Sequence, residues 1–506
     1  MSSASWIAFT SSESGAYVKI NTVELLTKFV EEISSNDAFA KALKGLDVSP
    51  LFFRGVQAPK AEEDEESDIH ECNAEDSKPC LFGDSQLITI IEKCSNLEVL
   101  CIGYGPQIIK AGDLINISGP ETGIDTTNGP SCLTEEALKR VAELSKLEIL
   151  NLYGCDNLSQ DIVAQIGVGC PNLKQLCIDG EDDDDDEDDG FEDVTDDEEQ
   201  EGEAAEEKPT ETEVEEEEEG RPWTVEDWKA FQNLEVLSAD SVELDVIAEL
   251  PKLTHIQIYP FAKQEVLKKF IEANADKLQY INVTEEYDYE EAEDVSVSHS
   301  RMPSEILKCS KLESFNTDVF DHTEAHAEGF FDKIVDSFPN LKHLEIAADA
   351  EVASTTQIIV SKLTKLESLV WESEDITDET VEAIVKSLTN LRNLQLTFSE
   401  KLSETTVALI AENLKSLEQL NVNSITPASF ELFKNNCPHL FEVGVIQGDE
   451  LKKEHLADIN AKLPNLHSLC VGGEIAEEMI EALMEVVPEV EYHIDGLDVE
   501  EESDEE

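Results

Sequence analysis

Leu147-Glu-Ile-Leu-Asn-Leu-Tyr-Gly-Cys155 decides the fold of this 506-residue chain, because it joins a strand pattern to a turn. The pattern Leu-x-x-Leu-x-Leu, with conservative substitutes, recurs along the sequence. Its first position is held by Leu97, Leu147, Leu173, Leu234, Leu253, Leu278, Leu312, Leu341, Leu366, Leu391, Leu417, Leu440 and Leu466. Most successive spacings lie near 25 or 26 residues, and two larger ones fit one repeat plus an insertion. A fixed period of this length predicts stacked structural repeats.

Short amphipathic helices are predicted between the strand patterns, for example over residues 133–144, 376–388 and 402–410. Each begins near a Thr or Ser, carries acids in its first turn and then apolar residues three or four apart. One strand and one helix cannot bury an apolar face alone, so the units must stack. The prediction is an α/β solenoid with parallel strands on the concave face, helices outside and disordered acidic insertions.

These units resemble the leucine-rich repeat superfamily, and its cysteine-containing subtype in particular. The resemblance rests on the unit at 147–158, on Cys170-Pro-Asn-Leu173, and on the similar Cys94-Ser-Asn-Leu97 and Cys437-Pro-His-Leu440. It covers about residues 84–497 and implies a horseshoe-shaped repeat array. Cys94, Cys170, Cys309 and Cys437 each precede a repeat leucine by three residues. We expect them to be small buried apolar residues at helix ends.

Charge limits the partners that the chain can have. Its 114 acidic and 36 basic side chains give a net charge of −78, which excludes most direct nucleic-acid binders and disfavours an anionic membrane. Four clusters, at 62–76, 181–219, 285–294 and 498–506, hold 49 of the acids. Such runs are predicted to be disordered, and they either solubilise the chain or attract and shield a basic protein. Thr195 and Ser503 lie in acidic contexts that resemble kinase sites.

The predicted organisation is a helical N-terminal cap over 1–56, an acidic linker over 57–83, and a solenoid over 84–497. A disordered acidic insertion interrupts the solenoid at 180–221, and an acidic tail occupies 498–506. Residues 46–53 are a candidate for a degenerate first strand. After the insertion, Trp223-Thr-Val-Glu-Asp-Trp228 predicts a helix start, with Thr224 and Asp227 as a capping box and the two tryptophans as a hydrophobic staple.

The location predicted from the sequence is cytoplasmic, nuclear or both. The first residues lack the basic and apolar regions of a signal peptide, and no apolar run reaches the roughly 18 residues of a membrane span. Eleven cysteines are an odd and dilute set, which favours free thiols in a reducing compartment.

The candidate binding surface is the inner face of the sheet. Residues two and four positions after each repeat leucine should point away from the core, because side chains alternate along a strand. Most are uncharged and able to hydrogen-bond, which predicts a wide neutral surface for a protein ligand. With two tyrosines two positions further on, the candidates are Asn151, Tyr153, Gln175, His255, Gln257, Tyr259, Tyr280, Asn282, Asn316, His343, Glu345, Asn393, Gln395, Gln419 and Asn421.

No motif of a phosphate loop, dinucleotide fold, zinc protease or serine hydrolase is present, so no enzyme activity, cofactor or metal is predicted. We expect a non-enzymatic scaffold that binds a protein partner, with acidic loops that attract or shield basic proteins. A sharper version is a chaperone for histones or ribosomal proteins, similar in logic to the acidic leucine-rich nuclear phosphoproteins. The alternatives are a substrate-recognition subunit of a ubiquitin ligase and, less favoured, a Ran GTPase-activating-type protein.

Overall fold

The computed structural model describes the repeats and leaves the acidic clusters outside its described residues, together with Thr195 and Ser503. The described residues are 7–8, 17–20, 22–52, 82–103, 133–155, 157–178, 223–240, 242–259, 264–283, 303–316, 330–346, 352–397, 402–447, 451–466, 468–472, 482 and 489–493. The chain divides into two compact units. The first is Met1–Pro251 with Ile258–Pro260, and the second is Lys252–Gln257 with Phe261–Glu506.

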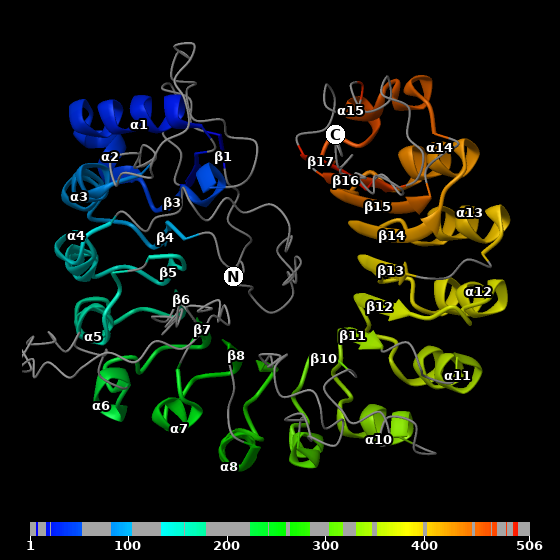
Figure 1. The fold of residues 1–506 in the computed structure, drawn as a ribbon, viewed down its shortest axis with the longest axis horizontal. Helices are drawn as coiled ribbons and strands as arrows, with labels where there is room; N and C mark the ends of the chain where they lie inside the picture. Colours follow the sequence, from blue (N-terminus) through cyan, green and yellow to red (C-terminus); the bar gives the residue numbers. More distant parts are fainter. Residues whose placement is uncertain are drawn as a thin grey trace, which may run out of the picture. The chain divides into compact units, whose positions relative to one another are not determined.

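The first unit alternates short strands with helices, and its helices lie on one side of its strands (Figure 1). Its elements are β1 (Ile7–Ala8), β2 (Tyr17–Lys19), α1 (Val23–Ser35), α2 (Asp37–Ala42), β3 (Gly45–Asp47), η1 (Ser49–Phe52), α3 (Asp84–Lys93), β4 (Val99–Cys101), α4 (Glu135–Lys139), η4 (Arg140–Glu143), β5 (Ile149–Leu152), α5 (Gln160–Gly169), β6 (Gln175–Ile178), α6 (Val225–Trp228), β7 (Val236–Asp240) and α7 (Leu244–Ile247). Strand β8 (His255–Tyr259) has residues in both units.

The second unit follows the same plan. Its elements are α8 (Gln264–Asn274), β9 (Tyr280–Val283), η5 (Ser304–Lys308), β10 (Ser314–Asn316), α10 (Phe330–Ser337), β11 (His343–Ile346), α11 (Val352–Lys362), β12 (Ser368–Glu372), α12 (Asp378–Ser387), β13 (Asn393–Thr397), α13 (Glu404–Asn413), β14 (Gln419–Ser424), α14 (Pro427–Asn436), β15 (Glu442–Gln447), η6 (Lys453–Leu456), α15 (Ile459–Lys462), β16 (Ser468–Gly472) and β17 (Glu489–His493).

The leucine pattern sets the strand register. All thirteen strands from β4 to β16 begin two residues after the predicted repeat leucine. Pairing is parallel and aligns equivalent leucines, as in Leu100↔Leu150↔Leu176 and Leu369↔Leu394↔Leu420. These leucines are 0 to 1% exposed. The architecture is therefore that of a leucine-rich repeat solenoid, as predicted, with one layer of strands covered by one layer of helices.

The N-terminal region contains strands as well as the expected helices. Residues 1–56 hold α1 and α2, but β2 and β3 also pair in parallel with each other, and β3 pairs with β4. Strand β3 coincides with the start of the degenerate strand suggested by the sequence. Strand β2 was not foreseen, because three residues are too few to show the repeat pattern.

Four cysteines occupy the helix ends where they were predicted. Cys94, Cys170 and Cys437 are the C-caps of α3, α5 and α14, and Cys309 is the C-cap of η5. All four are at most 1% exposed. Burial raises the pKa of the Cys94 and Cys170 thiols to about 12 and that of the other two to about 11, which keeps them protonated.

The re-entry at Trp223 has the predicted capping box and staple. The Thr224 backbone N–H donates to Asp227 Oδ2 at 2.8 Å, and the Thr224 hydroxyl donates to the same oxygen at 2.7 Å. The rings of Trp223 and Trp228 lie 5.3 Å apart between centroids. Trp228 is 1% exposed and packs on Phe231, so the pair fixes the start of α6 within the first unit.

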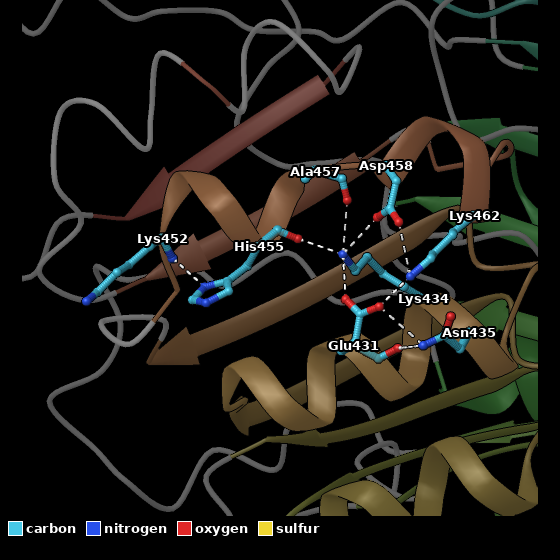
Figure 2. A network of polar contacts seen from close by, with 8 residues as sticks. All are labelled: Glu431, Lys434, Asn435, Lys452, His455, Ala457, Asp458 and Lys462. Atoms are coloured by element: carbon cyan, nitrogen blue, oxygen red, sulfur yellow. Dashed lines mark hydrogen bonds and ion pairs between the residues drawn. The ribbon is translucent and has the colours of Figure 1, made fainter.

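A buried lysine anchors the irregular segment before β16 in the second unit (Figure 2). Lys434 Nζ donates to the backbone carbonyls of His455 and Ala457 at 2.9 and 3.1 Å, and to Asp458 Oδ1 at 3.1 Å. It also pairs with Glu431 Oε2 at 2.7 Å. Hydrogen bonds from Lys434 and Lys462 lower the pKa of Glu431 to about 2. This lysine therefore joins α14 to the next repeat through groups that are distant in sequence.

Candidate interaction surface

The side of each sheet opposite the helices carries two rows of side chains, which we call the strand face. The first row holds the residues two positions after each repeat leucine, and the second row those four positions after it. Parallel neighbours in one row are about 4.8 Å apart, and the rows are about 6.6 Å apart along the strands. None of the 26 positions is Lys or Arg, and only Glu345 and Glu442 are carboxylates.

The second unit has a polar strand face. Its strand pairing places Ser314, His343, Ser368, Asn393, Gln419, Glu442 and Ser468 side by side in the first row. The second row is Asn316, Glu345, Val370, Gln395, Asn421, Gly444 and Cys470. We call Asn393, Gln395, Gln419 and Asn421 the amide patch, because these four carboxamides occupy both rows on the adjacent strands β13 and β14.

The first unit has a less polar strand face. From β4 to β7, its first row is Val99, Ile149, Gln175 and Val236, and its second row is Cys101, Asn151, Cys177 and Ser238. The polar members Asn151, Gln175 and Ser238 are only 4 to 7% exposed. The uniform neutral surface expected from the sequence is therefore two different surfaces.

Asn151 supports the backbone of its own unit. Its Oδ1 accepts a hydrogen bond from the Tyr153 backbone N–H at 3.0 Å. Gly103 approaches this turn so closely that a Cβ there would lie 2.6 Å from Asn151 Oδ1 and overlap the Tyr153 backbone. Asn151 thus has a structural role, and the half-buried Tyr153 lies beside it.

Asp47 is a second polar group held within the first unit. It accepts hydrogen bonds from the Ser49 backbone N–H at 3.1 Å and the Ser49 hydroxyl at 2.6 Å. Burial raises the pKa of Asp47, although Lys19 at 4.0 Å opposes the shift.

Two acceptors of the amide patch have no hydrogen-bond donor among the described residues. Gln419 is 2% exposed, and its Nε2 donates to Glu442 Oε2 at 2.8 Å, which orients that carboxylate. In contrast, Asn393 Oδ1 and Asn421 Oδ1 are buried and accept no hydrogen bond from the part of the chain that the structure describes. Gly444 lets the Asn421 amide lie against β15, since a Cβ at Gly444 would be 3.0 Å from Asn421 Cγ.

Two histidines of the second unit's strand face are neutral at physiological pH. Burial lowers the pKa of His343 to about 3, with Lys342 and Arg392 adding to the shift, and lowers that of His255 to about 4. Both ring nitrogens of His343 lack a partner among the described residues. His255 Nδ1 lies 2.9 Å from Thr254 Oγ1, and its ring stacks on Tyr280 with centroids 6.3 Å apart.

Several ion pairs lie beside the strands, between residues one position after repeat leucines. In the second unit Lys342 pairs with Glu313 at 2.6 Å and Arg392 with Glu418 at 2.7 Å. In the first unit Lys174 pairs with Glu148 at 2.7 Å. The basic residues nearest the rows are therefore engaged with carboxylates of adjacent repeats, which leaves the second unit's face to its amides and glutamates.

The structure places the sequence-predicted residues in different settings. Asn151, Tyr153 and Gln175 belong to the first unit, whereas His255, Gln257, Tyr280, Asn282, Asn316, His343, Glu345 and the amide patch belong to the second. Tyr259 lies in β8, and its side chain is outside the described residues. Glu442, Ser368 and Gly444 were not singled out, although their row positions were the available signal.

The described residues contain neither a group of three or more His, Cys, Asp or Glu that could hold a metal ion nor a helix long and apolar enough to cross a membrane.

Comparisons with known proteins give structural likeness only. No protein-family model matches the chain, and no curated protein matches its sequence. A chain of the Rad7–Elc1 complex from yeast is similar over 67% of this chain and 81% of that one, at 16% identity and a TM-score of 0.40. An internalin from Listeria monocytogenes (12% identity, 90% and 93% coverage, TM-score 0.27) and a leucine-rich repeat protein from Leptospira interrogans (14%, 80% and 91%, 0.29) are also similar. At these scores no function is transferred to this chain.

Proposed function

We propose that this chain is a non-enzymatic scaffold that binds a protein partner on the strand face of its second unit. The observation that carries the proposal is the pair of polar rows in continuous register from β10 to β16, with buried acceptors that have no partner in the part of the chain that the structure describes. An unsatisfied buried acceptor costs free energy, which a partner's donor would recover. Extended repeat surfaces of this kind suit protein ligands.

The acidic clusters would act before this contact forms. A strongly negative chain accelerates encounter with a basic protein and repels acidic ones, and this effect falls with salt. The sharper form of the proposal is a chaperone for histones or ribosomal proteins, in which the clusters attract or shield the partner and the strand face selects it.

The test is binding of purified histones and ribosomal proteins to the full chain and to three variants. The first variant replaces every Asp and Glu in Glu181–Glu219 by Asn and Gln. The second is Gln395→Lys on the second unit's face, and the third is the control Ile149→Lys on the first unit's face. We expect the neutralised cluster to slow association, Gln395→Lys to weaken binding about ten-fold or more, and Ile149→Lys to match the wild type. Equal binding by all four proteins would overturn the proposal.

The two alternatives are separated by direct assays. Co-purification of an adaptor subunit would favour a ubiquitin-ligase receptor, and stimulated GTP hydrolysis would favour a Ran GTPase-activating-type protein.

A further inference from the structure

The amide patch and the neighbouring carboxylate form a polar region on β13, β14 and β15. Asn393 and Gln419 are adjacent in the first row, and Gln395 and Asn421 are adjacent in the second. Glu442 continues the first row on β15, and Gln419 holds its carboxylate. The region thus places four carboxamides and a negative charge within the width of three strands.

The unpaired oxygens indicate which chemical groups a ligand would have to supply. Asn393 Oδ1 and Asn421 Oδ1 need donors, and the described parts of the chain supply none. Rotation of either amide about χ2 breaks no hydrogen bond at Oδ1 and can turn that oxygen towards a ligand. A ligand that carries donors and positive charge is complementary to both the amides and Glu442.

We infer that the amide patch binds guanidinium groups of an arginine-containing extended segment of a protein partner. This inference rests on the proposed function and names the partner's chemistry. A guanidinium presents five N–H donors in a planar fork and is always charged, so one group can contact a carboxylate and an amide oxygen together. An ammonium is a compact point charge with three donors and matches this arrangement less well.

The row spacing favours arginines at alternate positions. In an extended segment, residues i and i+2 point to the same side about 6.6 Å apart, which is the distance between the two rows. An Arg-x-Arg segment can therefore place one guanidinium over the first row near Glu442 and the other over the second row near Asn421.

Replacing Asn393 and Asn421 by leucine, an apolar residue of similar shape, separates an effect on binding from an effect on stability. Asn421→Leu and Asn393→Leu remove an unpaired buried acceptor while keeping similar volume, so we expect the free protein to be as stable as the wild type or more stable. The same changes remove contacts to guanidinium, so affinity falls while stability does not. A variant that only damaged the fold would lose both.

The experiment measures anisotropy of a labelled heptapeptide that alternates Arg with Gly, and of its Lys counterpart, with the full-length protein. Salt of about 0.3 M screens the acidic clusters, which are the same in every variant. We expect the wild type to bind the Arg peptide about ten-fold more tightly than the Lys peptide, and Asn393→Leu/Asn421→Leu to abolish that preference. Gln175→Ala, which removes a carboxamide from the first unit's face, is the control and should retain it.

Equal affinity for the two peptides, or an unchanged preference in the double Leu variant, would overturn the inference. Its failure is distinguishable from failure of the proposed function. If Gln395→Lys still abolishes binding of whole partner proteins, the strand face remains the interaction surface and only the arginine chemistry is wrong.

Discussion

The two strand faces of this molecule are built from the same repeat and have opposite characters. In the first unit, Val99, Ile149 and Val236 occupy the first row, Asn151 and Asp47 are hydrogen-bonded within the unit, and the buried Ser238 hydroxyl has no partner among the described residues. In the second unit, amides and glutamates occur in both rows beside serines and a histidine, and two of the amide oxygens have no partner among the described residues. The difference is therefore one of composition: the first unit's face is mostly apolar and the second unit's face is mostly polar, and we propose the second as the face that binds a partner.

The largest expected effect is on stability, and it compares an alanine substitution at one glycine of each unit, Gly103 and Gly444. Gly103→Ala places a Cβ against the Tyr153 backbone, which cannot move aside, so we expect a loss of about 3 kcal/mol in the first unit's stability. Gly444→Ala meets only the Asn421 side chain, which can rotate, so it should cost less than about 1 kcal/mol and weaken partner binding instead. Segment-resolved hydrogen exchange and binding assays measure the two effects. A stability loss of the same size in both variants would contradict this expectation.

The Lys434 network tests whether the second unit's stability is independent of its polar face. Lys434→Met removes the lysine donor from the His455 and Ala457 carbonyls, and it leaves Glu431 and Asp458 with Lys462 as their remaining lysine partner. We expect a loss of about 2 kcal/mol, seen as faster exchange over residues 451–462. Lys462→Met removes a more exposed lysine from the same network and should cost less than half as much. Partner binding over β13 and β14 should persist in both, and its loss would show that the network and the face are coupled.

Acidification should affect the two faces in opposite directions. His343 has a folded pKa of about 3 against about 6.5 when unfolded, so its contribution is complete above pH 6.5 and is lost as the pH falls towards 3. The slope is at most about 1.4 kcal/mol per pH unit. Asp47 has a raised folded pKa, so the first unit gains stability from this group as the pH falls. Hydrogen exchange from pH 7 to pH 5 measures the stability of each unit. Comparing His343→Gln and Asp47→Asn with the wild type gives the part of the pH dependence that each side chain contributes. If His343→Gln leaves the slope of the second unit unchanged, the imidazole is solvated.

The smallest expected effect concerns the entry of the chain into α6. Asp227→Ala removes the acceptor for the Thr224 backbone N–H and should destabilise the first unit by about 1 kcal/mol. Asp227→Asn keeps an acceptor at the same place and serves as the matched control. Thermal unfolding compares the three proteins, and binding at the second unit should not differ. A loss in Asp227→Asn as large as that in Asp227→Ala would show that the charge, not the hydrogen bond, matters.

The repeat could be predicted because the interactions that form it connect residues close in sequence. A leucine that begins a strand pattern, a Thr or Ser N-cap and a cysteine at a helix end each act within a few residues. Hence the thirteen strand starts, the capping box at Thr224 and the buried thiols match the prediction. The limits of the helices were less accurate, since the helix expected over 133–144 divides into α4 and the 3-10 turn η4.

The candidate site was predictable only as a set of positions. Alternation along each strand identified the rows, but it treated Asn151 and Asn421 alike. Their contacts differ: Asn151 accepts a hydrogen bond from the Tyr153 backbone N–H two residues further along the chain, whereas Asn421 lies against Gly444 of the next strand and its Oδ1 receives no hydrogen bond from the described residues. The Lys434 network was missed because its partners at 455–458 are 21 to 24 residues away in sequence.

The sequence by itself determined the repeat, its register and the acidity. The spacing of the apolar residues gives the repeat and its register, and the count of charged residues gives the acidity. Only the tertiary structure decided which polar groups of the described residues have hydrogen-bond partners and which do not. Hydrogen-bond satisfaction depends on the direction and distance of groups brought together by stacking, and a one-dimensional pattern does not contain that information.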